Sequence, residues 1–108
     1  MRNVVLARVD DRLIHGEVVT AWIPTYKATR ILIIDDDVAK DEFNVRVVKA
    51  LAPAGTKVFV YTVEKASEKL MVPGVEGERL LLLAKTPTTF NRLIQNGVPL
   101  KEVNLGGA

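Results

Sequence analysis

Five short apolar runs, separated by segments with helical spacing, constrain the fold of this chain most strongly. Hydrophobicity is continuous along each run rather than alternating, which is typical of strands that are covered on both faces. The runs occupy residues 3–9, 30–35, 56–61, 79–84 and 101–105. A strand and a helix repeated four times and then a fifth strand predict an open, doubly wound, mainly parallel α/β sheet with helices on both faces.

Four segments between the runs carry the apolar spacing of amphipathic helices. In the first, Pro24 is expected to end or kink the helix near Ile23. The last is expected to begin with Thr86 as N-cap and Pro87 as its first residue. The four apolar faces consist of Val19, Trp22, Ile23 and Tyr26; of Phe43, Val47 and Leu51; of Val63, Ala66, Ser67 and Leu70; and of Phe90, Leu93 and Ile94, the last three facing inward.

Composition excludes several classes of protein. A chain of 108 residues with 48% hydrophobic and 26% charged residues is globular rather than disordered. The net charge of +2 is scattered along the sequence, so there is no electrostatic footprint for nucleic acid. The absence of cysteine excludes disulfides, thiolate chemistry and cysteine-based zinc sites, and fits a reducing cytoplasm. The run at residues 79–84 is too short to cross a bilayer, so we expect no direct membrane insertion.

The stretch from Arg8 to Trp22, RVDDRLIHGEVVTAW, contains the only histidine and the only tryptophan of the chain. In doubly wound sheets, ligands bind beyond the carboxyl ends of the strands, and His15 follows the first predicted strand. The next helix is expected to start near His15 or Gly16, where free backbone N–H groups and the helix dipole favour a bound anion. Arg8 and Arg12 add two guanidiniums whose geometry matches phosphate oxygens.

These surroundings favour phosphoryl chemistry at the histidine. Nearby positive charge disfavours the imidazolium form, so the His15 ring is kept neutral and nucleophilic. The guanidiniums can stabilise the charge of a phosphoryl group accepted on its nitrogen. Asp10 is the candidate for orienting an arginine or fixing the imidazole tautomer. The alternative is an ordinary solvated or packed histidine, and the residues alone support the two interpretations about equally.

The same stretch closely resembles the active-site segment of the IIB domain of the mannose/fructose/sorbose family of the bacterial sugar phosphotransferase system, whose usual form is R-[IV]-D-x-R-L-[IL]-H-G-Q-V. Glu17 stands where glutamine is usual. The similarity continues through ILIIDDDVAKDEF, VFVYTVEKA and KTPTTFNRLIQNGVPLKEVNLGG, nearly to the end of the chain. The resemblance implies a parallel α/β fold and a single IIB-like domain over residues 1–108. Family members continue well beyond Gly106 and Gly107, so we expect this domain to be truncated at its C-terminus.

The resemblance implies a phosphocarrier, a protein-N(π)-phosphohistidine–sugar phosphotransferase. His15 would accept a phosphoryl group from a phosphohistidine of a IIA domain and pass it to a sugar carried by the membrane subunits IIC and IID. The matched motif makes Arg8 and Arg12 phosphoryl-binding residues and Asp10 an organising one, with no cofactor or metal at this domain. It implies a cytoplasmic location with membrane association through IIC and IID. It leaves open a homodimer and the identity of the sugar, whether mannose, fructose, sorbose or an amino sugar.

Two other functions use different residues. Asp10 and Asp11 together with the three aspartates at 35–37 are a possible Mg²⁺ site for aspartyl-phosphate chemistry, as in receiver-like domains. The third run, however, ends without an aspartate to phosphorylate and the fifth without a lysine, and we interpret residues 35–37 as the acidic start of a helix. A non-catalytic binding module is the other alternative, although the G-x-G-x-x-G nucleotide fingerprint is absent from the first turn.

Further residues lie at the same predicted edge of the sheet. Thr62, Thr86, Gly106 and Gly107 follow the third, fourth and fifth runs and could border a phosphate. We expect the two threonines to be N-caps instead, and the glycines have the alternative role of a turn. Leu13 is expected to be packed; if it were exposed with Ile14, the two would be natural contacts for IIA.

Overall fold

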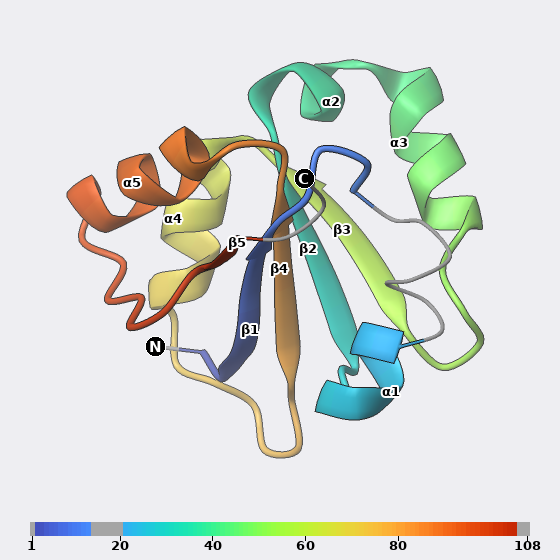
Figure 1. The fold of residues 1–108 in the computed structure, drawn as a ribbon, viewed down its shortest axis with the longest axis horizontal. Helices are drawn as coiled ribbons and strands as arrows, with labels where there is room; N and C mark the ends of the chain where they lie inside the picture. The colour runs from blue at the N-terminus through green and yellow to red at the C-terminus, as the bar shows by residue number, and fades with distance from the viewer. Residues whose placement is uncertain (1, 14–20, 106–108) are drawn as a thin grey trace.

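Five parallel strands form the central sheet of the computed structural model, which describes residues 2–13 and 21–105 (Figure 1). Within these residues the strand order is β3-β2-β4-β1-β5. The strands are β1 (Val4–Val9), β2 (Arg30–Ile34), β3 (Lys57–Tyr61), β4 (Leu80–Ala84) and β5 (Asn104–Leu105). Each predicted run therefore contains a strand, the last with only two residues, and the predicted parallel α/β sheet is confirmed.

The described residues contain five helices, where the sequence predicted four. They are α1 (Ile23–Tyr26), α2 (Asp36–Lys40), α3 (Glu42–Ala50), α4 (Val63–Met71) and α5 (Pro87–Gln95). The additional helix is α2. The Asp35 side chain accepts hydrogen bonds from the backbone N–H groups of Asp37 and Val38, which confirms the predicted acidic helix start. Asp41 then has an extended backbone and caps α3, so it separates the two helices.

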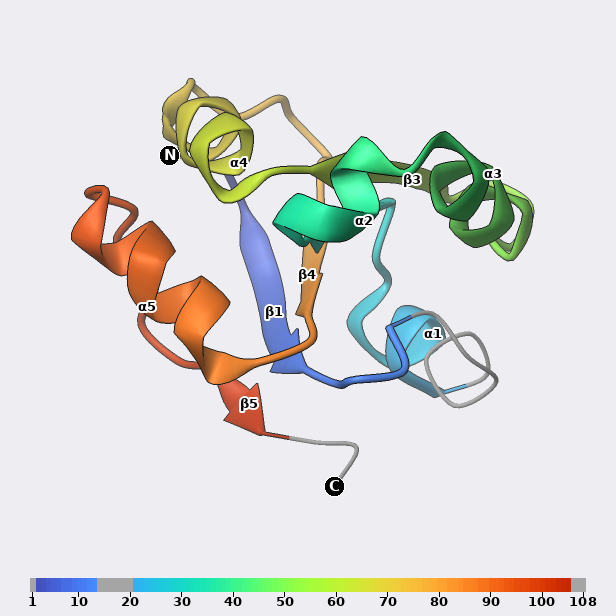
Figure 2. The same ribbon diagram turned by 90° about the horizontal axis from the view of Figure 1, so that it is seen from above.

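Both faces of the sheet are buried, which explains the continuous apolar runs. In β4, Leu80, Leu82 and Ala84 lie in the core shared with α4 and α5. Leu81 and Leu83 lie in the second core, which includes residues of α1 and α2 and the partly buried Val48 of α3. Seen from above in Figure 2, α4 and α5 lie on one side of the sheet and α1 and α3 on the other. The predicted doubly wound arrangement is confirmed.

Two predicted helix faces require correction. Ile94 was expected to face inward but is 46% exposed, because the buried stripe of α5 is centred on Thr89, Phe90 and Leu93. The apolar face of Phe43, Val47 and Leu51 is also exposed, with 70%, 41% and 49% of each residue accessible. In α3 it is the half-buried Val45 and Val48 that turn away from solvent. Helix α4 buries Val63, Ala66 and Leu70.

Pro24 does not end its helix near Ile23. Helix α1 begins at Ile23, contains Pro24 in its first turn and continues to Tyr26, after π-helical geometry at residues 21–22. A proline is tolerated there because the first N–H groups of a helix have no partner within it. The prediction that Pro24 ends the helix is wrong, because α1 continues to Tyr26; the start of the predicted helix at Val19 lies outside the described residues.

The strand order creates a topological switch point between β1 and β4. The connection that leaves β1 crosses β4 to reach β2, whereas the connection that leaves β4 crosses β1 to reach β5 in the opposite direction. Ligands of doubly wound sheets bind in the crevice that such diverging connections leave at the carboxyl ends. The N–H of Asp10 donates to the carbonyl oxygen of Ala84 at 2.9 Å, which fixes the start of the first loop at this point.

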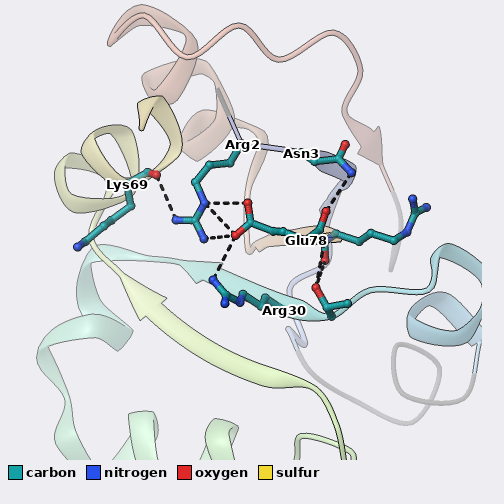
Figure 3. Close-up of polar contacts among 7 residues, drawn as sticks. Arg2, Asn3, Arg30, Lys69 and Glu78 are labelled. Atoms are coloured by element: carbon teal, nitrogen blue, oxygen red, sulfur yellow. Dashed lines mark hydrogen bonds and ion pairs between the residues drawn. The ribbon is translucent and has the colours of Figure 1, made fainter. Parts of the chain in front are cut away.

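The opposite, amino-terminal edge of the sheet holds a cluster of Arg2, Arg30 and Glu78, called here the Glu78 cluster (Figure 3). Glu78 is buried, and Nε of Arg2 donates to its two carboxylate oxygens at 3.1 and 3.0 Å. Nη1 of Arg30 donates to the same carboxylate at 3.2 Å, and Arg2 also donates to the carbonyl oxygen of Lys69. This cluster ties together the segments that enter β1, β2 and β4.

Candidate functional site

Asp10 organises the first loop. It follows β1 directly, is 0% exposed, and its Oδ1 accepts hydrogen bonds from the backbone N–H of Arg12 at 3.1 Å and from the Arg12 Nε at 3.3 Å. Its carbonyl oxygen accepts from the N–H of Leu13 at 3.0 Å. The carboxylate and the main chain of one residue therefore close a tight turn over residues 10–13.

Leu13 anchors the end of this turn. Its φ is 55°, in the left-handed region that a leucine adopts only at a cost of about 1–2 kcal/mol. The side chain is buried in the same core as Ile23, Ile31 and Ile33, and burial of a leucine contributes about 1.5–3 kcal/mol. The expectation that Leu13 is packed is confirmed, and its burial offsets the strained backbone.

Arg8 extends from β1 into a buried site between three neighbours. Its guanidinium carbon lies 4.1 Å from the centre of the Trp22 ring, which is within the range of a cation–π interaction. Its Nη1 donates to Oδ1 of Asn104 at 2.9 Å, and its Nε lies 3.8 Å from Oδ2 of Asp10. The side chain is only 6% exposed, so this positive charge is largely removed from water.

Arg12 lies on the other side of the same carboxylate. Its Nε is 3.3 Å from Oδ1 of Asp10, and 53% of its side chain is exposed. Arg8, Asp10 and Arg12, called here the Asp10 cluster, thus bring two guanidiniums onto one carboxylate at the switch point. One negative and two positive charges leave a net positive charge, which favours a bound anion.

His15 lies outside the described residues, as do Ile14, Gly16 and Glu17. Of the four predicted site residues, the structure brings Arg8, Asp10 and Arg12 together, and the turn they form ends at Leu13, two positions before His15 in the sequence. The glycines at 106 and 107 also lie outside the described part of the chain.

The predicted caps are found at the same edge. Thr62 is the N-cap of α4, and its hydroxyl oxygen accepts from the N–H of Lys65 at 3.1 Å. Thr86 is the N-cap residue of α5 and Pro87 its first residue, as predicted, although the Thr86 hydroxyl caps no N–H within the described residues. The N-cap interpretation is confirmed for Thr62, and for Thr86 the N-cap position is confirmed without the capping hydrogen bond.

The aspartates at 35–37 contribute to the fold and do not join Asp10. Asp35 caps α2, while Oδ1 of Asp36 accepts from the N–H of Val63 and its Oδ2 pairs with Nη1 of Arg92, both at 2.9 Å. These contacts, first the Val63 hydrogen bond and then Arg92, hold the pKa of Asp36 below its usual value. Among the described residues, no group of three or more acidic, histidine or cysteine side chains is placed to hold a metal ion. The aspartates considered as Mg²⁺ ligands in the receiver-like alternative therefore do not form a metal site.

Two residues of the site were not predicted from the sequence. Asn104 is paired with Arg8 in the β1–β5 register, a relation that requires the strand order to be known. Trp22 was assigned to the core, and it is partly buried against that core as expected, but its ring also carries the Arg8 guanidinium. Both residues lie in the quoted motifs, yet no spacing rule links either one to Arg8.

Helices long and apolar enough to span a membrane are absent from the described residues.

Comparison with known proteins identifies the family of this chain. The family described as "PTS system sorbose subfamily IIB component" matches residues 4–108. The chain is 41% identical to the fructose-specific EIIB component of Bacillus subtilis over 99% of its own length and 66% of that protein, and 40% identical to the mannose-specific EIIAB component of Escherichia coli over 94% of its length and 32% of that protein. The chain therefore spans about two thirds of the first relative and about one third of the second.

Solved structures give the same result. The manxB protein of Thermoanaerobacter tengcongensis superposes with a TM-score of 0.89 at 39% identity, covering 100% of this chain and 65% of that one. The IIBSor domain of the sorbose permease from Klebsiella pneumoniae gives a TM-score of 0.89 at 38% identity, covering 97% of this chain and 64% of that one. With its fold, its Asp10 cluster and these matches, the chain belongs to the sorbose-subfamily IIB components of the sugar phosphotransferase system.

Proposed function

We propose that this chain is a phosphocarrier in which His15 accepts a phosphoryl group from a phosphohistidine of a IIA domain. In that step the N–P bond on IIA breaks and an N–P bond to the His15 imidazole forms. In the next, the N–P bond on His15 breaks as a sugar hydroxyl oxygen bonds to phosphorus and releases its proton. The observation that carries the proposal is the Asp10 cluster, two guanidiniums on one buried carboxylate at the switch point, whose last member, Arg12, lies three positions before His15 in the sequence.

The roles of the cluster follow from its contacts. The Arg12 side chain is 53% exposed, so its guanidinium is accessible to a phosphoryl group that arrives from another protein. Arg8, buried, supplies fixed positive charge in a site of low dielectric constant, where electrostatic stabilisation is strongest. Asp10 holds both arginines and the backbone turn, so we assign it a positioning role.

The proposed partners follow from family membership. The E. coli relatives carry IIA and IIB in one protein by name, and we propose a IIA domain as the phosphoryl donor here. The relatives are named for fructose, mannose and sorbose, and we propose a sugar presented by membrane IIC and IID subunits as the acceptor. This assigns the domain to the cytoplasm, with membrane contact through those subunits.

Labelling tests the proposal directly. The protein is incubated with labelled phosphoenolpyruvate, the general phosphotransferases and a cognate IIA domain, and the phosphate bond is then characterised. We expect a label that is labile in acid and stable in base, as a phosphohistidine is, and that is absent from the His15→Ala variant.

Other outcomes would overturn it. A label that survives in His15→Ala excludes His15 as the acceptor. A label that is stable in acid and requires Mg²⁺ at this domain supports the aspartyl-phosphate alternative instead. Absence of label in the wild-type protein, with the IIA domain itself phosphorylated, would favour a non-catalytic docking module.

A further inference from the structure

We propose that Trp22 is a positioning residue whose ring holds the Arg8 guanidinium in a fixed orientation at the site of phosphoryl transfer. The inference rests on the proposed function, because it assigns Trp22 to the same site. In this role Trp22 supports a charged side chain in addition to packing against the core.

The ring forms a fixed platform for the guanidinium. The Arg8 guanidinium carbon is 4.1 Å from the Trp22 ring centre, well inside the distance of about 6 Å at which a cation–π interaction acts. The ring itself stacks on Tyr26 with centres 6.1 Å apart and an angle of 24° between the planes. Both aromatic side chains pack against the buried core on this face of the sheet. Trp22 is thus held from behind while it contacts Arg8.

Asn104 and Asp10 hold the edges of the same guanidinium. Oδ1 of Asn104 accepts from Nη1 at 2.9 Å, and Oδ2 of Asp10 lies 3.8 Å from Nε. Asn104 pairs with Arg8 in the parallel register of β1 and β5, so its position is set by the backbone. A planar group that is supported on one face and at two edges retains little freedom to rotate.

Arg8 nevertheless has unused hydrogen-bonding capacity. Its Nε is buried and has no hydrogen-bond partner within the described residues. Buried polar groups nearly always have a partner, and an arginine used only as a structural element would normally have its donors satisfied. The Trp22 ring contacts the face of the guanidinium and takes none of its N–H donors, which a carboxylate in its place would.

Kinetics of His15 phosphorylation test the proposal with three variants. Trp22→Leu removes the aromatic face, Trp22→Phe keeps one, and Tyr61→Leu is the matched control, since Tyr61 belongs to a stacked aromatic pair, with Phe59, that packs against the other core. At saturating phosphorylated IIA, we expect Trp22→Leu to lower the single-turnover rate about tenfold, within the strength of a desolvated cation–π contact. Trp22→Phe should stay within about twofold of wild type and Tyr61→Leu should match wild type.

A double-mutant cycle shows whether Trp22 acts through Arg8. In an Arg8→Met background, where the rate is already lowered, Trp22→Leu should cause no further loss. Equal losses in Trp22→Leu and Tyr61→Leu, equal losses in Trp22→Leu and Trp22→Phe, or a full additional loss in the Arg8→Met background would each overturn the proposal, because they indicate a general packing effect.

An NMR measurement separates this inference from the proposed function. A proton above an aromatic face is shifted by the ring current, so the Arg8 side-chain N–H signals should be shifted in wild type and Trp22→Phe and return to ordinary values in Trp22→Leu. Persistence of the shift in Trp22→Leu overturns the positioning role whatever the kinetics show. Failure of the wild type to take label at His15 overturns the proposed function, while the NMR result still decides whether Trp22 holds Arg8.

Discussion

The two ends of the sheet each place one acidic side chain between two arginines, yet the two clusters are bonded differently. In the Glu78 cluster, Nε of Arg2 donates to both carboxylate oxygens, Nη2 of Arg2 donates to Oε1, and Arg30 adds a fourth hydrogen bond (Figure 3). The side chains of Glu78 and Arg2 are only 2% and 11% exposed. Such bidentate, charge-assisted bonding is strong and leaves the carboxylate well satisfied.

The Asp10 cluster is open to solvent at Arg12. Nε of Arg12 lies 3.3 Å from Oδ1 of Asp10, Nε of Arg8 lies 3.8 Å from Oδ2, and 53% of the Arg12 side chain is exposed. It also lies at the switch point, whereas the Glu78 cluster lies where the strands begin. The comparison indicates that the buried Glu78 cluster holds the strands together, while the Asp10 cluster keeps positive charge accessible at the switch point.

The largest expected effect is on stability at the amino end. Glu78→Gln leaves Arg2 and Arg30 without their carboxylate, and breaking a buried pair in this way should lower the free energy of unfolding by about 3 kcal/mol. Urea unfolding measures this directly. A loss below about 1 kcal/mol would mean that the Glu78 cluster stabilises the fold no more than an exposed ion pair does.

The second effect is on catalysis at the carboxyl end. Arg12→Ala should lower the rate of His15 phosphorylation about a hundredfold, because charge that stabilises the transferring group is lost. The side chain is half exposed, so the free energy of unfolding should change by less than about 1 kcal/mol. Glu17→Gln, which restores the usual family residue, is the control and should change the rate much less. Equal rates in the two variants would contradict this assignment.

Acid should weaken the amino-end cluster. The hydrogen bond from Arg2 holds the pKa of Glu78 below its ordinary value. A lowered pKa in the folded state stabilises the fold above the unfolded-state pKa, which is about 4.3 for glutamate, and the stabilisation is lost as pH falls through the folded-state value. Urea midpoints from neutral to acidic pH should therefore fall more steeply in wild type than in Glu78→Gln. Parallel curves for the two proteins would contradict the pKa shift.

The smallest effect is expected at Asp36, which lies at the carboxyl end but outside the Asp10 cluster. Asp36→Asn should cost about 0.5–1 kcal/mol of stability, because the pair with Arg92 is half exposed, and it should leave His15 phosphorylation unchanged. The labelling assay and urea unfolding check both parts. A lost phosphate label in this variant would instead revive the aspartyl-phosphate interpretation.

The sheet could be predicted from the sequence because strands that are buried on both faces have continuous rather than alternating hydrophobicity. All five residues of β4 are 0% exposed, and its LLLLA run has no alternation. Helix faces were harder to predict, because apolar spacing does not say which side meets the sheet. Phe43, Val47 and Leu51 share a face as predicted, but that face is exposed on α3.

The local part of the site was predictable, and its long-range part was not. Arg8, Asp10 and Arg12 lie within five residues, so a strand end and a tight turn suffice to bring them together. The contact between Arg8 and Asn104 spans 96 positions and depends on β5 pairing with β1, which the winding rule alone does not fix. The contact between Arg8 and Trp22 joins residues 14 positions apart, and no spacing rule predicts it.

The most direct test neutralises one carboxylate at each end of the sheet and compares the rate of His15 phosphorylation per folded molecule. The variants are Asp10→Asn and Glu78→Gln, measured at a temperature at which circular dichroism shows both to be folded. The difference between the two clusters predicts that Asp10→Asn lowers the rate about tenfold, the cost of about 1.4 kcal/mol of lost positioning, and that Glu78→Gln retains the wild-type rate. Equal rates in the two variants would contradict the assignment of the Asp10 cluster to phosphoryl transfer.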